Sequence, residues 1–155
     1  MRTFEQNIFI DRPRLEVYNH IAEPINMIGL QPYLTTIDIL KEQKNAEGLV
    51  LRPFYTVETI RWLGLPVRRN RIYWVIHLTK PHSELEFHVY RNSNTEIVLD
   101  FLIQESEEGR THLTQRFRFE KVGRLQGNRV FNQAVKTQRA FLTNLKVRLE
   151  KSLAT

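Results

Sequence analysis

The 155-residue sequence contains no cysteine. This absence excludes disulfide bonds, a thiolate nucleophile and metal sites built on cysteine. Long hydrophobic runs are also missing, since no apolar stretch approaches the ~20 residues that a helix needs to cross a bilayer. The opening segment, MRTFEQNIFI, lacks the unbroken apolar stretch of a secretory signal. We therefore expect a cytoplasmic protein that folds as one domain over residues 1–155.

Acidic residues are scarce towards the C-terminus. Residues 1–122 carry 16 Lys and Arg against 16 Asp and Glu, whereas residues 123–155 carry seven basic residues against one acid, Glu150. The whole formal net charge of +6 therefore belongs to the last part of the chain. Such a basic surface attracts anionic partners at low salt. Its basic face has no aromatic residues to stack on bases, so we expect no nucleic-acid binding.

Motifs for nucleotide, metal and serine-hydrolase chemistry are also missing. The chain has neither a glycine-rich phosphate loop nor a serine elbow. Its histidines show no pair at the spacing that places two metal ligands together within one helix or strand. We therefore expect no metal site and no cofactor. The histidines are His20, His77, His82, His88 and His112.

The hydrophobic rhythm changes at residues 11–13. Up to Ile10 the apolar residues fall at every second position, which predicts a strand, and afterwards they fall three or four apart, which predicts a helix to about Ile21. Asp11 is a suitable N-cap for this helix, because its carboxylate can accept hydrogen bonds from free amides of the first turn. Pro24 then allows a second short helical piece, PINMIGL.

From Leu34 to Lys121 the period of two returns in successive segments. Short turns between these segments predict an antiparallel meander. Pro53 indicates a sheet edge or a bulge. The predicted strands are LTTIDILKE, LVLRPFYTVETIRWL, RNRIYWVIHLT, ELEFHVY, TEIVLDFLIQES and THLTQRFRFEK.

The last predicted element is a long helix from about Arg124 to Leu149. Its apolar residues recur at steps of three and four, and Gln138 is the one polar residue within that stripe. At 1.5 Å per residue, roughly 26 residues make a rod of about 39 Å. Segregated strands and helices predict an α+β fold. If the first strand pairs with the last, a curved seven-stranded antiparallel sheet wraps around this helix, with two short helices after the first strand.

The chain resembles the helix-grip superfamily of START-related domains, the SRPBCC proteins of polyketide cyclase/dehydrase type. The resemblance covers nearly the full length and rests on IFIDRPRLEVYNHIAE, LGLPVRRNRIYWVIHLTKP, EEGRTHLTQRFRFE and the terminal helix. Many relatives carry a tryptophan shortly after the first helix, where this chain has AEPINMIGLQP. The resemblance implies a deep cavity between the sheet and the long helix.

Independent physical reasoning supports such a cavity. A strongly curved sheet cannot lie flush against a straight helix, so the residues that face the gap line a void unless large side chains fill it. The void would bind a small hydrophobic or amphipathic ligand, such as a lipid, sterol, polyketide or aromatic compound. The same aromatic residues can instead form a closed core, and a single bulge would swap the strand faces. The candidate ligand-binding residues are Trp74, Phe87, Phe101, Gln115, Phe117, Gln138 and Phe141.

Gln115 and Gln138 each interrupt an otherwise apolar face. A polar group in the interior needs a hydrogen-bonding partner. A ligand oxygen or a bound water would meet this need, and so would neighbouring backbone. If a ligand meets it, Gln115 or Gln138 would orient the polar end of the ligand.

Two functions other than ligand binding stay open. A cyclase or dehydratase needs an inward acid or base, and no spacing forces the candidates together. These candidates are Tyr55, Glu58, His77 and Asp100. We assign no catalytic residue.

An interaction protein would instead dock an acidic partner through the basic face of the last helix. Arg129, Lys136 and Arg139 lie on that face. The apolar stripe of the helix belongs to the core, so we expect no stable insertion into lipid.

Overall fold

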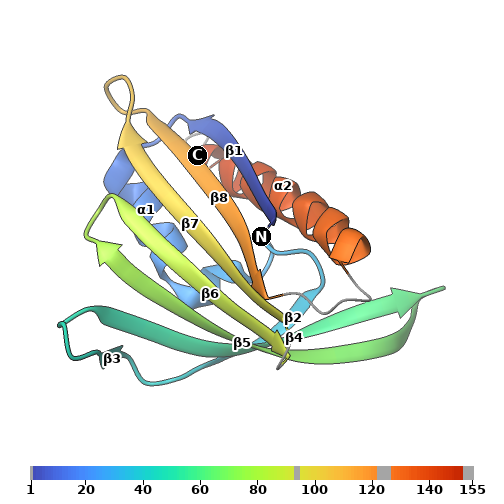
Figure 1. Cartoon of the computed structure of the whole chain (residues 1–155). Helices are drawn as coiled ribbons and strands as arrows, with labels where there is room; N and C mark the ends of the chain where they lie inside the picture. Colours follow the sequence, from blue (N-terminus) through green and yellow to red (C-terminus); the bar gives the residue numbers. More distant parts are fainter. Residues whose placement is uncertain (1, 93–94, 122–126, 152–155) are drawn as a thin grey trace.

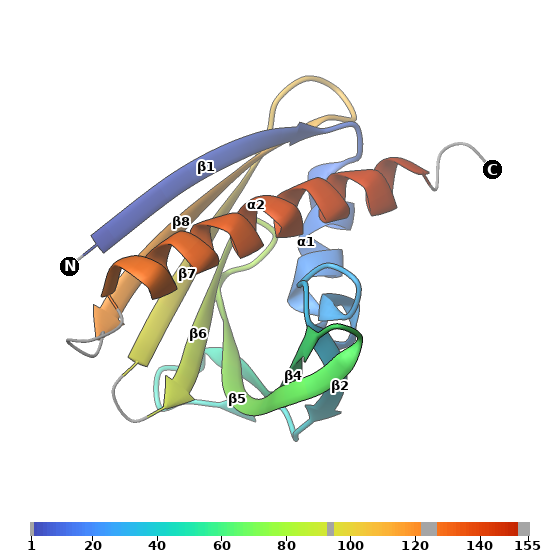
Figure 2. The same cartoon turned by 90° about the vertical axis from the view of Figure 1, so that its right-hand side faces the viewer.

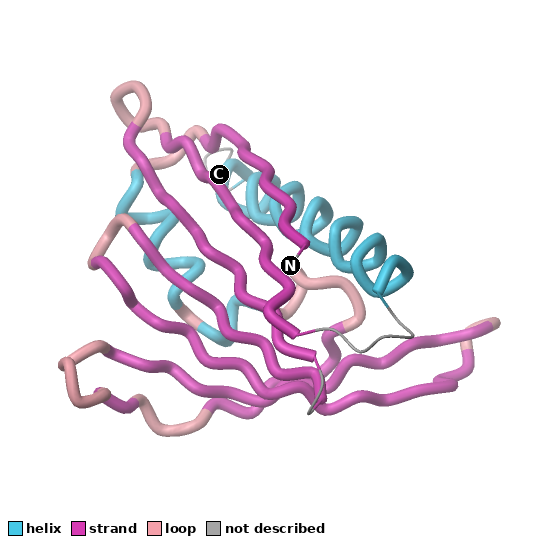
Figure 3. The backbone as a smooth tube through the Cα atoms, viewed as in Figure 1, coloured by secondary structure: helices cyan, strands magenta, loops and turns pink. Residues whose placement is uncertain are grey.

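The computed structural model describes residues 2–92, 95–121 and 127–151. Figures 1 and 3 show a bent sheet with the helices on one side of it. Within the described part of the chain, no helix combines the length and apolar character needed to span a membrane. The elements are β1 (Arg2–Ile10), α1 (Arg14–Ala22), the 3₁₀ helix η1 (Pro24–Met27), β2 (Leu34–Ile39), β3 (Gln43–Lys44), β4 (Val50–Trp62), β5 (Leu65–Lys80), β6 (Glu84–Asn92), β7 (Thr95–Glu105), β8 (Thr111–Lys121) and α2 (Gly127–Lys151).

The strands form one antiparallel sheet in the order β1-β8-β7-β6-β5-β4-β2, and the two-residue β3 also pairs with β4. β1 pairs with β8 from Arg2 opposite Phe119 to Ile10 opposite Thr111. The predicted pairing of the first strand with the last is therefore confirmed. Because β1 and β2 lie at opposite ends of this order, α1 and η1 carry the chain from one edge to the other. The seven-stranded antiparallel sheet is as predicted, with β3 as an addition.

The long C-terminal helix α2 crosses the concave side of the sheet (Figure 2). Its backbone runs closest to β1. Its apolar stripe is buried most deeply in the C-terminal half, where Phe141 and Leu145 are fully buried, while Phe131 and Ala134 in the N-terminal half are half-buried. The predicted start of this helix at Arg124 lies outside the described residues.

The structure corrects the predicted cap of α1. The N-cap is Pro13, and no side chain caps the helix. Asp11 makes other contacts: its backbone N–H donates to Glu150 on α2 at 3.0 Å, and its carboxylate lies 3.1 Å from the guanidinium of Arg110. Asp11 therefore ties the entry to α1 to the end of α2.

The structure also shows how the sheet accommodates Pro53. The edge alternative is wrong, because β4 lies between β5 and β2. Pro53 falls in the interval between the β2 and β3 pairings, and its carbonyl accepts from the backbone N–H of Leu40 at 3.1 Å. Proline has no N–H to offer a neighbouring strand, so it is tolerated where the pairing is interrupted.

Arg148 near the end of α2 holds η1 and the residue that follows it. Its guanidinium donates to the carbonyl oxygens of Asn26 and Ile28, at 2.7 Å each. Gly29 has a φ of +86°, and a Cβ at this position would lie 2.5 Å from Nη2 of Arg148. The left-handed backbone and the close guanidinium therefore both favour glycine here.

Replacing Gly29 with alanine should destabilise the fold more than replacing Gly48. Both glycines have positive φ, +86° and +81°, and nothing lies within 4 Å of a Cβ added at Gly48. Alanine costs about 1–2 kcal/mol at either position for the backbone alone. At Gly29 the methyl group also displaces Arg148, which should cost about a further 1 kcal/mol in urea unfolding. Equal losses in the two variants would show that Arg148 moves aside without cost.

Candidate functional site

Aromatic side chains on the concave face form a continuous row that reaches α2. Phe54 on β4 and Trp74 on β5 are register partners whose rings stack with centroids 5.7 Å apart. The row continues through Phe87 on β6 and Phe101 on β7 to Phe141 on α2, with centroid distances of 6.4, 5.1 and 5.8 Å. All five residues are buried. Packed rings therefore join the sheet to the helix.

A second aromatic group lies under the N-terminal half of α2. Phe117 on β8 contacts Phe119 at a centroid distance of 4.9 Å and Phe131 on α2 at 6.2 Å. Phe117 and Phe119 are buried, whereas Phe131 is half-buried. The interior is thus less tightly covered at this end of the helix than at the C-terminal end.

Four glutamines form a hydrogen-bonded chain through this interior, which we call the glutamine chain. Gln6 on β1 donates to Gln115 on β8 at 2.6 Å, and Gln115 donates to Gln138 on α2 at 2.8 Å. Gln138 in turn is 3.5 Å from the side-chain oxygen of Gln31, after η1. Gln115 is 0 % exposed, and Gln138 and Gln31 are 5 % exposed. The chain therefore connects the sheet, the long helix and the loop before β2.

The structure places all seven predicted ligand-binding residues in this buried interior. Gln115 and Gln138 bond to each other, rather than to backbone as one alternative proposed. The indole N–H of Trp74 donates to the hydroxyl of Thr56 at 2.7 Å. The role of these residues in ligand binding stays a prediction.

Sequence reasoning missed two members of the glutamine chain. Gln6 lies between Phe4 and Ile8 in the alternation of β1. The same reasoning that identified Gln115 as a polar residue on an apolar face would therefore also have identified Gln6. Gln31 lies outside any strand or helix, and no periodic signal marks it.

Of the four acid–base candidates, only Glu58 lies on the concave face. Alternation along β4 places it on the same side as Phe54 and Thr56, both buried in the interior. Its carboxylate lies 3.2 Å from the guanidinium of Arg91 on β6. The side chain of Glu58 is 14 % exposed and that of Arg91 is 34 % exposed. Arg91 was missed because the predicted strand ended at Tyr90, although the alternation of Phe87 and Val89 continues to Arg91, where the register shifts.

Tyr55, His77 and Asp100 lie on the convex face instead. Tyr55 contacts the ring of Tyr73 at 5.0 Å, and Asp100 accepts two hydrogen bonds from Arg118, at 2.9 and 3.1 Å. The condition that these candidates face inward is therefore not met. An acid–base role in the interior would fall to Glu58.

Two open hollows lie on the outside of the molecule. One, of about 570 Å³, follows α1 and includes Leu15, Asn19 and His20. The other, of about 560 Å³, lies between β1 and α2, where Phe4 faces Lys136 and Arg139. The basic face predicted on the last helix therefore lies along a groove beside β1. The side chain of Arg129 is outside the described part of α2.

Comparison by sequence gives no match, either among family models or among curated proteins. Comparison by structure gives matches over nearly the whole chain. A START superfamily protein from Mycobacterium smegmatis has a TM-score of 0.69 at 11 % identity, covering 96 % of this chain and 97 % of that chain. The chain has a START-like helix-grip fold.

Two further helix-grip structures match equally well. The Zhui aromatase/cyclase from a Streptomyces species has a TM-score of 0.71 at 15 % identity, covering 98 % of this chain and 95 % of that chain. Protein TTHA0849 from Thermus thermophilus has a TM-score of 0.70 at 10 % identity, covering 97 % and 99 %. At these identities the comparison establishes the fold, and the site must be argued from the residues of this chain.

The link between Gln115 and Gln138 should appear in a double-mutant cycle. Gln115→Leu and Gln138→Leu each leave a buried amide without its partner, which costs about 1–3 kcal/mol. Because the double variant removes both amides, its loss should be smaller than the sum of the single losses by about 1 kcal/mol. Urea unfolding measures the free energy of unfolding of the two single variants and the double variant. Gln104→Leu, on the exposed part of β7, is the control. Additive losses would show that the two amides do not stabilise each other.

Proposed function

We propose that the protein binds one small hydrophobic or amphipathic molecule between the sheet and α2. The glutamine chain is the observation that carries this proposal. Burying several amides in an aromatic interior is unfavourable unless each is hydrogen-bonded, and an apolar core of the same shape would fold without them. A row of amides next to aromatic rings offers a ligand both apolar contact and groups that orient its polar end.

The long last link of the glutamine chain supports this role. Gln138 reaches the side-chain oxygen of Gln31 only at 3.5 Å, which makes this the longest of the three links. A carbonyl or hydroxyl oxygen of a ligand can accept from these amides. Phe101 is the register partner of Gln115 and contacts Phe141 on α2, and each methylene that a ligand buries against these rings contributes about 0.8 kcal/mol.

A ligand would reach the interior most easily at the end of the sheet where β6 and β8 finish and β7 begins. Phe131 and Ala134, in the half of α2 that follows β8, are half-buried, whereas Phe141 and Leu145 are fully buried. The backbone of α2 runs closest to β1, so side chains alone span the distance to the central strands. We infer that a ligand enters by displacing half-buried side chains under this part of α2.

A displacement assay tests ligand binding. Anilinonaphthalene sulfonate bound to the protein should be displaced by a long-chain fatty acid, a sterol or a naphthol, with a change in tryptophan fluorescence from Trp74. Gln138→Leu should weaken the binding of an oxygen-bearing ligand about 3- to 10-fold, as expected for one lost hydrogen bond. Gln133→Leu, on the exposed face of the same helix, should leave the affinity unchanged.

Two results would contradict this proposal. Saturable binding that is equal in Gln138→Leu and Gln133→Leu would place the ligand outside the interior. No binding of any of the three compounds, with none found by mass spectrometry in an organic extract of the purified protein, would leave the interior as a closed core.

A second candidate function is cyclisation or dehydration of a polyketide-like chain. The observation that favours it is the ion pair of Glu58 and Arg91 on the concave face. The carboxylate could remove a proton next to a substrate carbonyl, and the guanidinium could stabilise the resulting oxyanion. One of the matching structures is an aromatase/cyclase, which agrees with this possibility.

The enzyme hypothesis predicts turnover that depends on Glu58. Incubation with a synthetic β-polyketone thioester should give cyclised product, detected by its absorbance and mass. Glu58→Gln should abolish the reaction because the amide cannot accept the proton, while Glu120→Gln on the convex face should have no effect. Equal product from Glu58→Gln and the unchanged protein would reject this hypothesis without affecting ligand binding.

A further inference from the structure

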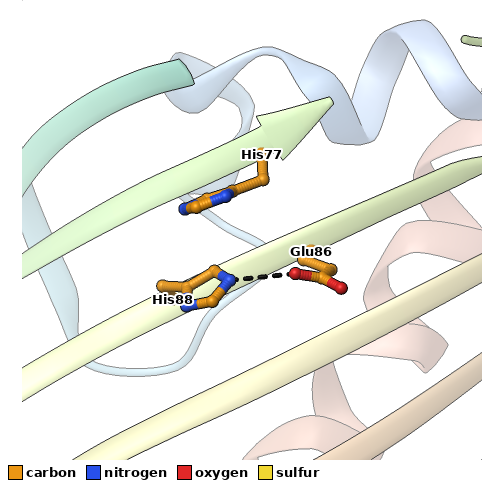
Figure 4. A group of neighbouring side chains, drawn as sticks. All are labelled: His77, Glu86 and His88. Carbon is orange, nitrogen blue, oxygen red and sulfur yellow. Dashed lines mark hydrogen bonds and ion pairs between the residues drawn. The ribbon is translucent and has the colours of Figure 1, made fainter. Parts of the chain in front are cut away.

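Three potential metal ligands lie together on the convex face of the sheet, on the opposite side from the aromatic row. His77 on β5 is the register partner of Glu86 on β6, and His88 follows Glu86 by two residues. All three side chains therefore project from the same face. Figure 4 shows the ring of His77 next to that of His88, with the carboxylate of Glu86 turned towards His88.

The distances within this group suit a metal ion. One ligand atom from each residue lies within 4.8 Å of the others. Nε2 of His88 is 3.0 Å from Oε2 of Glu86, and the two imidazole rings stack with centroids 3.9 Å apart. Around a tetrahedral Zn²⁺, ligand atoms at about 2.0–2.1 Å from the ion lie about 3.3 Å from one another. The ligand atoms must therefore move closer by at most about 1.5 Å, which rotation of the side chains about their χ angles allows.

The group is partly shielded from solvent. His88 lies between Val75 and Val98 in the register, and both valines are buried although they belong to the convex face. The side chain of His88 is 19 % exposed and that of Glu86 is 33 % exposed. An apolar surround on one side favours tight coordination, and the open side leaves space for water as a further ligand.

Arg118, on the same face, is paired with other acids. Arg118 lies 2.9 Å from Asp100 and 2.8 Å from Glu120. Asp100 is the register partner of Glu86 on the neighbouring strand. The ion pairs of Arg118 are therefore with Asp100 and Glu120, and the carboxylate of Glu86 contacts His88.

The ligand atoms of these three residues favour one class of metal ion. Two imidazole nitrogens and one carboxylate suit divalent transition metals, whereas Ca²⁺ and Mg²⁺ prefer oxygen ligands alone. We propose that His77, Glu86 and His88 bind Zn²⁺ or a metal of its class, with the fourth position open to water. The ion would join β5 to β6 on the face opposite the proposed ligand site.

The expectation of no metal site rested on histidine pairs within one element. His77 and His88 belong to two strands, and only the register of β5 against β6 brings them together. The spacing of Glu86 and His88, two residues apart on a predicted strand, was the sequence signal available.

Titration of the chelator-treated full chain with Zn²⁺ by calorimetry tests this site. The unchanged protein should bind one Zn²⁺ per chain, and its Tm should rise by about 5–10 °C when free Zn²⁺ is about 100 times Kd. His77→Gln, Glu86→Gln and His88→Gln should each weaken binding by more than the roughly 10- to 100-fold that loss of an outer-shell partner costs. Mg²⁺ should produce neither heat of binding nor a Tm shift.

His112→Gln is the matched control. His112 is a half-buried histidine on the same face, stacked on Phe9 at 4.6 Å and outside the group. Its substitution should leave Zn²⁺ affinity unchanged, and far-UV circular dichroism should show that every variant is folded. Absence of one-to-one binding by the unchanged protein would overturn the proposal. Binding that survives in the three variants, or that is lost in His112→Gln, would do the same.

Discussion

The pairing of β1 with β8 is the constraint on which the rest of the structure depends. Once the first strand lies beside the last, the chain between them must reach the opposite edge before β2 can start, and α1 and η1 make that crossing. The helix that follows β8 then has the concave side of the sheet available and lies across it (Figure 2). Contacts between the two ends of the chain reinforce this arrangement, because Asp11 bonds to Glu150 and Arg148 bonds to η1 and the residue that follows it.

The two faces of the sheet have different chemistry. The concave face carries the aromatic row, the glutamine chain and the ion pair of Glu58 with Arg91. The convex face carries tyrosines, ion pairs and the group formed by His77, Glu86 and His88. Because successive side chains of a strand point to opposite faces, one set of strands builds both surfaces, and a change on one face need not alter the other. The proposed ligand binding inside and the proposed metal binding outside should therefore be separable by mutation.

Much of the fold could be predicted from the sequence, because alternation and helical periodicity are local signals. They placed Trp74, Phe101 and Phe117 in the interior, and they marked Gln115 and Gln138 as polar exceptions. The partners of these residues depend on register and on how helix and sheet meet, which no local pattern contains. Gln31 lies in a loop and had no periodic signal, whereas Arg91 continues the alternation of β6 one residue beyond the predicted strand. Asp11 shows the opposite failure, since a sound local rule for caps was overridden by contacts with Glu150 and Arg110.

The glutamine chain has a direction, because each amide donates through nitrogen and accepts through oxygen. Its two ends are therefore unlike: the Gln31 end presents N–H groups, and the Gln6 end presents a carbonyl oxygen. Rotating one amide by half a turn would set oxygen against oxygen on one side and nitrogen against nitrogen on the other, so neighbouring amides must turn together. A molecule that brings a donor instead of an acceptor to Gln31 would then reverse every link.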